Sequence, residues 1–133
     1  MKKRIIGIVI VLWIVGGIIV FSYSYQREKK LRLCHAILRG DILKVKSLLQ
    51  SGDSPNVRFP LEAHYNSVPL HFAVMRDDVQ ITKVLFEAGA DPNLIDADER
   101  TPLDLALRWQ HSDIIQLLTD SGGRTGAKAN TND

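Results

Sequence analysis

Hydrophobic residues follow two different patterns along this chain of 133 residues. In the first, residues 5–21 are all apolar or glycine, so a helix built from them has no polar face. In the second, from Leu33 onward, apolar residues recur at spacings of three and four, as Leu70, Ala73 and Val74 do, which is typical of one face of an α-helix. The first pattern predicts a membrane-spanning helix and the second predicts a domain of amphipathic helices.

The apolar run is long enough to cross most of a bilayer. Its 17 residues extend roughly 26 Å as a helix, and Ser22 and Tyr23 bring it close to the thickness of the hydrocarbon core. A basic head (1–4) precedes it and a basic juxtamembrane linker (24–32) follows it. We therefore expect residues 5–23 to form an uncleaved transmembrane signal anchor that contacts membrane lipid.

The same segment also fits a secretory signal peptide cleaved after residues 22–24, which would release a soluble periplasmic or secreted protein. The run is longer than the usual core of a signal peptide, and this favours the anchor. Basic residues flank both ends, and we expect the short basic head to stay inside. The expected product is a single-pass protein of a bacterial inner membrane, with the following domain on the periplasmic side.

Three segments of the remaining chain repeat one pattern of helix, short turn, helix and glycine: residues 33–58, 66–95 and 96–123. The offset is 37 residues from the first to the second and then 33. Equivalent positions hold the same residue type in all three: Ala36, Ala73 and Ala106 in the first helix, Leu48, Leu85 and Leu118 in the second, and Gly52, Gly89 and Gly122 at its end. Small alanines let the two helices approach closely, and glycine accepts the left-handed conformation that ends a helix.

Two of the repeats open on "VPLHFA" (68–73) and "TPLDLA" (101–106), and "EAGADPN" (87–93) follows the second helix pair. These motifs and the period of 33 resemble ankyrin repeats. The resemblance implies an all-α fold: a solenoid of about three helix-turn-helix repeats, here preceded by one N-terminal transmembrane helix. Val68 lacks the hydroxyl that would cap its helix, and Asp104 replaces the motif's histidine. Beyond the repeats, we expect residues 124–133 to form a disordered tail.

Charge and composition narrow the function. Seven of the 17 basic residues flank the apolar run. From residue 33 onward the chain therefore has 10 basic and 14 acidic residues, and this negative net charge argues against a nucleic-acid partner. His64 and His71 lack other metal ligands at suitable spacing, and Cys34 is alone, so we expect no metal, cofactor or disulfide. Asp96 and its acidic neighbours are typical of a solvated hairpin tip. We therefore expect neither catalysis nor a small-molecule substrate.

The resemblance implies recognition of a protein through the hairpin tips and the exposed side of each first helix, which together form a concave face. We expect a membrane-tethered adaptor or inhibitor; the alternative is a soluble scaffold that protects or regulates an enzyme. Arginines beside aromatic and other large apolar side chains suit an acidic or mixed protein surface. The expected contact residues are Phe59, Glu62, His64, Tyr65, Met75, Arg76, Asp98, Arg100, Arg108 and Trp109.

Overall fold

The computed structural model describes the backbone of residues 2–61 and 65–126, and the side chains of these residues except 2–13, 23–24, 26–30, 60–61 and 65–66. Helices and short strands follow one another along this part of the chain. They are α1 (Lys2–Arg39), α2 (Ile42–Gln50), β1 (Phe59–Leu61), β2 (Tyr65–Ser67), α3 (Pro69–Met75), α4 (Val79–Glu87), α5 (Pro102–Trp109) and α6 (Ser112–Asp120).

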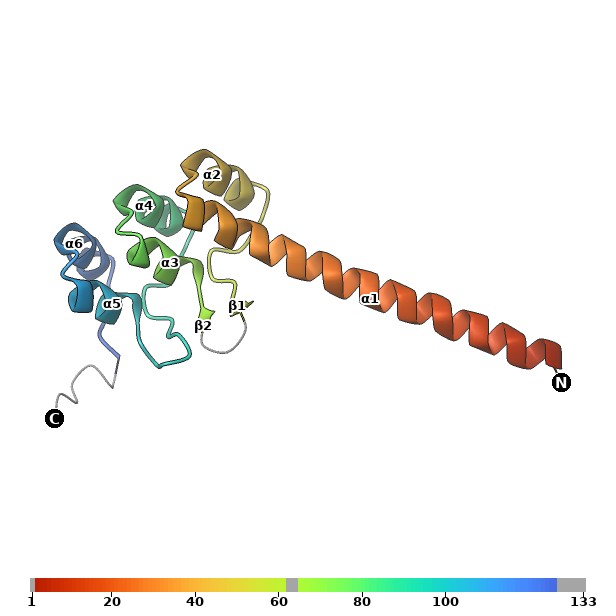
Figure 1. Cartoon of the computed structure of the whole chain (residues 1–133). Coiled ribbons are helices and arrows are strands. Elements are labelled where there is room, and N and C mark those ends of the chain that lie inside the picture. The colour runs from red at the N-terminus through yellow and green to blue at the C-terminus, as the bar shows by residue number, and fades with distance from the viewer. Residues whose placement is uncertain (1, 62–64, 127–133) are drawn as a thin grey trace.

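Helix α1 continues without a break from the apolar run into the first repeat (Figure 1). The helix does not break near residues 22–25. The C-terminal turns of α1 belong to the repeat core, because Leu33, Ala36 and Ile37 are buried there. Cys34 lies well inside α1. Within the residues that the structure describes, no helix is both long and apolar enough to cross a lipid bilayer.

The six helices of the described residues form two layers, with α1, α3 and α5 in one and α2, α4 and α6 in the other (Figure 1). The helices of the first layer run parallel. At their C-terminal ends, Arg76 donates from Nη1 to the Leu38 carbonyl, and His111 Nδ1 lies 3.1 Å from the Val74 carbonyl. At the other end, His71 Nε2 lies 3.0 Å from the carbonyl of Arg100, just before α5. Each contact joins one repeat to the next.

Short polar side chains cap three of the described helices. Asp41 and Asp78 accept hydrogen bonds of 2.9 Å from backbone N–H groups in the first turns of α2 and α4. Thr101 caps α5 in the same way, through the N–H of Asp104. The predicted absence of a side-chain cap at Val68 is confirmed, because this side chain makes no hydrogen bond to the first turn of α3. Three glycines end the second helices in the expected left-handed conformation: Gly52, Gly89 and Gly122 (φ +92°, +88° and +81°).

The described part of the fold is all-helical as expected, apart from one short β-hairpin whose strands the sequence did not predict. Residues 59–61 and 65–67 pair as a two-stranded antiparallel sheet in which Phe59 lies opposite Ser67. The Phe59 side chain is fully buried, and its ring packs edge-on against that of Phe72, with centroids 5.5 Å apart. The hairpin before α3 is four residues longer than the next one, and this extra length allows two strands to pair while the aromatic ring anchors them to the core.

The first residues after α6 continue the stacking pattern. Asn56 bonds the Gly89 carbonyl and the Asp91 N–H, and Asn93 makes the equivalent pair of bonds to the Gly122 carbonyl and the N–H of residue 124. The N–H of residue 126 then donates to the Asp104 carboxylate. Residues 124–126, expected to begin a disordered tail, are thus hydrogen-bonded to the domain, and residues 127–133 lie outside the described part.

Candidate protein-binding groove

A hollow of about 220 Å³ opens where α3 and α5 meet the loops that precede them. We call it the concave groove; its lining residues are Ser67, Met75, Asp96, Arg100, Leu105, Arg108 and Trp109. Leu105, Arg108 and Trp109 are spaced by three and four residues, so one side of α5 presents all three to the groove. Met75 joins them from the end of α3.

One wall of the groove is a tightly bonded loop. Asp96 Oδ1 accepts hydrogen bonds of 2.9 Å from the backbone N–H groups of Asp98 and Arg100, and Oδ2 accepts from the Arg100 guanidinium at 2.8 and 2.9 Å. Burial opposes ionisation of Asp96, but these hydrogen bonds and the positive charge of Arg100 hold its pKa below the usual value. Asp98 also pairs with Arg100. The arginine is therefore fixed in position, and its charge is largely compensated.

The opposite wall is apolar and exposed. Met75 and Trp109 are 40% and 41% exposed, although both are large apolar side chains. The Trp109 ring also contacts the His111 imidazole, with centroids 5.8 Å apart, which restrains it. Beside it, Arg108 is exposed and makes no ion pair with any residue that the structure describes. The groove thus combines exposed apolar surface with an uncompensated cation, the composition that favours protein recognition.

Four of the ten expected contact residues meet in this groove: Met75, Arg100, Arg108 and Trp109. Asp98 lies beside them, paired with Arg100. The others do not join this group, for different reasons.

The expectation for Phe59 is wrong, because its buried ring belongs to the core and offers no surface to a partner. Arg76 is exposed, but its guanidinium donates to the C-terminal end of α1 and lies against Gly40. Its principal contact therefore joins two repeats. Tyr65 lies in β2, with its side chain outside the described part, and Glu62 and His64 lie outside the described residues.

Sequence reasoning missed three lining residues of the groove. Asp96 was expected at a solvated hairpin tip, but only 5% of it is exposed. The spacing of four residues between Asp96 and Arg100 could have indicated its burial, because it allows the carboxylate to bond both the backbone and the side chain of the arginine across a short loop. Leu105 was identifiable from its position three residues before Arg108 on the same helical face. Ser67, buried at the end of β2, carried no signal.

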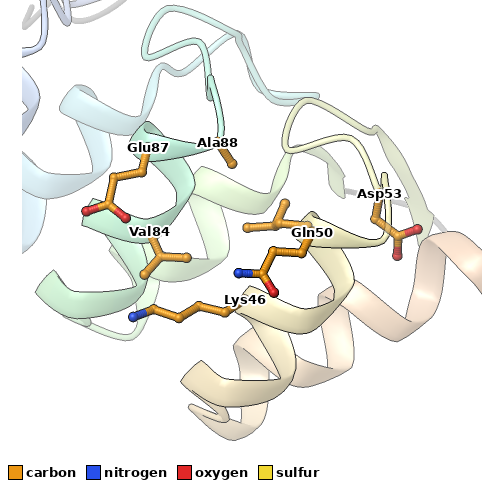
Figure 2. Close-up of a pocket in the computed structure, with 7 residues that line it drawn as sticks. Lys46, Gln50, Asp53, Val84, Glu87 and Ala88 are labelled. Atoms are coloured by element: carbon orange, nitrogen blue, oxygen red, sulfur yellow. The ribbon is translucent and has the colours of Figure 1, made fainter.

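A second hollow, of about 410 Å³, lies on the opposite layer between α2 and α4 (Figure 2). Lys46, Gln50, Val84 and Glu87 line it, with no arginine or aromatic ring in the lining. Among the described residues, no three His, Cys, Asp or Glu side chains are grouped to hold a metal ion. The concave groove is thus the better candidate for recognition, although it is smaller.

The remaining titratable groups have structural roles. His71 is fully buried, and burial lowers the pKa of its imidazole below the usual value. Its Nδ1 accepts from the Val68 N–H at 3.4 Å, so the neutral ring carries its proton on Nε2 and donates to the Arg100 carbonyl. Burial also raises the pKa of the Cys34 thiol to about 11, which keeps it protonated and unreactive at neutral pH.

Comparison with known proteins supports the same interpretation of the repeats. The family model described as "Ankyrin repeats (3 copies)" matches residues 33–133. Human protein fem-1 homolog C is 36% identical over 75 residues, which are 47% of this chain and 12% of that protein. Mouse Rabankyrin-5 is 44% identical over 57 residues, which are 43% of this chain and 5% of that protein.

A third relative, the human transient receptor potential cation channel subfamily A member 1, is 24% identical over 106 residues, 73% of this chain and 9% of the channel. The chain spans only a small part of each of these larger proteins. Ankyrin repeats are protein–protein interaction modules, so the groove lies on a fold that serves binding. The match over residues 33–133, together with the stacked helix pairs, shows that the chain belongs to the ankyrin repeat family.

Proposed function

We propose that the chain is a membrane-tethered adaptor or inhibitor that binds a protein partner through its concave groove. The observation that carries the proposal is the meeting of exposed Met75 and Trp109 with Arg108 in one hollow. Tryptophan, tyrosine and arginine carry much of the binding energy at protein interfaces, and methionine is enriched there. The hollow beside these residues can bury a side chain of the partner away from water, whereas a flat surface cannot.

The charges of the groove define the partner surface further. Arg100 is already paired with two carboxylates, so a partner gains little by approaching it. Arg108 has no such pair among the described residues, and a guanidinium can bind a carboxylate while it stacks on an aromatic group. The complementary partner segment therefore carries an acidic residue next to a large apolar one, with the apolar side chain in the hollow.

The tether is supported by the sequence. Residues 5–21 form an apolar run behind a basic head, and the side chains of residues 5–13 lie outside the described part. In its described portion, Ile14, Ile18 and Phe21 are 56%, 62% and 75% exposed on α1, with no protein surface to cover them. A lipid bilayer would bury these side chains. Tethering raises the effective concentration of the module for a partner in the same membrane.

The proposed location is the inner membrane of a bacterium, with the repeats on the periplasmic side. A tethered chain stays with membranes after washing at high salt and alkaline pH and keeps its N-terminus. A soluble chain whose mature N-terminus is Tyr25 would replace the tether with a released binding module.

Affinity capture from solubilised membranes tests the proposed binding. We expect the tagged full-length chain to retain a partner protein that Trp109→Ala binds about 30-fold more weakly, because removing an interface tryptophan costs about 2 kcal/mol. Lys83→Ala is the matched control, since Lys83 is exposed on α4, in the opposite layer. Loss of binding in the Lys83 variant alone would place recognition on the other layer.

A further inference from the structure

We infer that α1 is a rigid spacer that holds the concave groove at a fixed height above the bilayer, with the hairpins turned toward the lipid. The partner would then be a membrane protein, bound at the segment that emerges from the bilayer. This inference rests on the tether proposed above, and it adds a distance and an orientation that a flexible tether does not impose.

The first support is the continuity of α1 with the repeat core. The helix extends over 38 residues from Lys2 to Arg39, which is about 57 Å. Leu33, Cys34 and Ile37 at its C-terminal end are at most 1% exposed, so this end of the helix is packed into the core of the repeats. Arg76 also bonds the Leu38 carbonyl from the neighbouring repeat. Rotation of the domain about its tether would require α1 to break.

The second support is the direction of the helices. The first-layer helices run parallel with their C-terminal ends side by side, so α1 extends past the stack only at the N-terminal ends (Figure 1). The β1–β2 hairpin and the loop of residues 95–101 immediately precede α3 and α5, at those same ends. The hairpins therefore lie on the side from which the apolar run emerges.

The alignment of the repeats gives the height of α3 and of the groove above the hydrocarbon core of the bilayer. With an offset of 37 residues, Pro69 at the start of α3 is level with Arg32, and Met75 in the groove is level with Leu38. If the apolar segment ends at Tyr23, these levels lie about 14 and 22 Å beyond the hydrocarbon core at 1.5 Å per residue. The headgroup region occupies roughly the first 5–7 Å of that distance.

The space beneath the groove is therefore narrow. Between the headgroups and the level of Pro69 lie only about 7–9 Å, less than the diameter of one helix with its side chains. A large soluble domain does not fit into this space and can approach the groove only from the side, whereas a loop or helix end that leaves the bilayer reaches the level of the groove after about 22 Å. The geometry thus favours a membrane-embedded partner over a soluble one.

Spin labels on the full-length chain test the spacer. In a Cys34→Ala background, a nitroxide is attached at Ala97→Cys on the hairpin side or at Ser112→Cys at the far end; both original residues are exposed. The chain is reconstituted in vesicles of phosphatidylethanolamine and phosphatidylglycerol that contain a nickel-chelating lipid. Because α5 adds about 12 Å of height, we expect the lipid to enhance relaxation roughly fivefold more at position 97 than at 112.

Two insertions between Glu28 and Lys29 provide the controls. Seven helix-favouring residues add about 10 Å with little rotation, so enhancement should fall at both positions while position 97 stays the stronger. Seven glycine and serine residues should make the two positions nearly equal. If the chain without an insertion floats with the vesicles but shows equal relaxation enhancement at positions 97 and 112, the rigid spacer is refuted and the tether is not. A chain that fails to float would overturn the tether and the spacer together.

Discussion

Replacing His71 by leucine tests how one repeat is joined to the next. The imidazole is buried and bonds two backbone groups, the Val68 N–H before α3 and the Arg100 carbonyl before α5. Leucine fills a similar volume but accepts and donates nothing. Both backbone groups would lose their partner, one inside the repeat and one in the following repeat.

The expected cost follows from these two bonds. A buried polar group left without a partner costs about 1–3 kcal/mol. The Arg100 site is partly buried and the bond to Val68 is long, so we expect a total near 3 kcal/mol. This is a large share of the roughly 5–15 kcal/mol that stabilises a domain, and it lowers Tm by about 15 °C in a domain of this size.

The imidazole also makes stability depend on pH. Burial lowers the pKa of His71 in the folded state, so the unfolded chain takes up the proton first as the pH falls below about 6.5. The folded state therefore loses stability through that range, and His71→Leu should remove this part of the pH dependence.

Urea unfolding of the full chain in detergent measures both effects. Trp109 fluorescence reports on the repeats once Trp13→Phe has removed the other tryptophan. His35→Ala is the matched control, because His35 is exposed on α1. Equal stability of the His71→Leu and His35→Ala variants at pH 7 would refute the structural role of this histidine.

Three other substitutions and one labelling reaction are expected to give distinct results. Arg76→Ala should lower the free energy of unfolding by about 1 kcal/mol through the lost bond to α1, while Arg108→Ala leaves it unchanged in urea titrations. Cys34, buried with a pKa of about 11, should react with a maleimide only after denaturation, as mass spectrometry would show. Because the pKa of Asp96 is lowered in the folded state, the wild-type chain should lose stability as the pH falls below about 3.9, where an unfolded aspartate takes up its proton. Asp96→Asn should be less stable at neutral pH and should lack this part of the pH dependence.

The repeats were predictable because their physical requirements recur at fixed spacing. Alanine where helices approach, leucine in the second helix and glycine at its end mark each repeat in the sequence. The same logic identified Met75, Arg108 and Trp109 as neighbours, because equivalent positions of stacked repeats lie side by side.

Positions that depend on pairing between segments were harder to predict. Phe59 looked like a surface residue in a loop, but the lengthened hairpin folds its ring against Phe72. Arg76 had the composition of a binding residue, yet its guanidinium reaches a carbonyl 38 residues earlier in the chain. Loop conformation and such distant contacts decide these roles, and a local pattern of apolar and polar residues contains neither.

Photo-crosslinking in intact membranes tests the central claim, that the concave groove is the surface that meets a protein partner. A photoreactive amino acid placed at Met75 lies at the groove, and the same group at Lys83 lies on the opposite layer. We predict that irradiation links a membrane protein to the chain from position 75 and that Arg108→Ala weakens this product. A crosslinked protein from position 83 with none from position 75 would contradict the assignment of the groove.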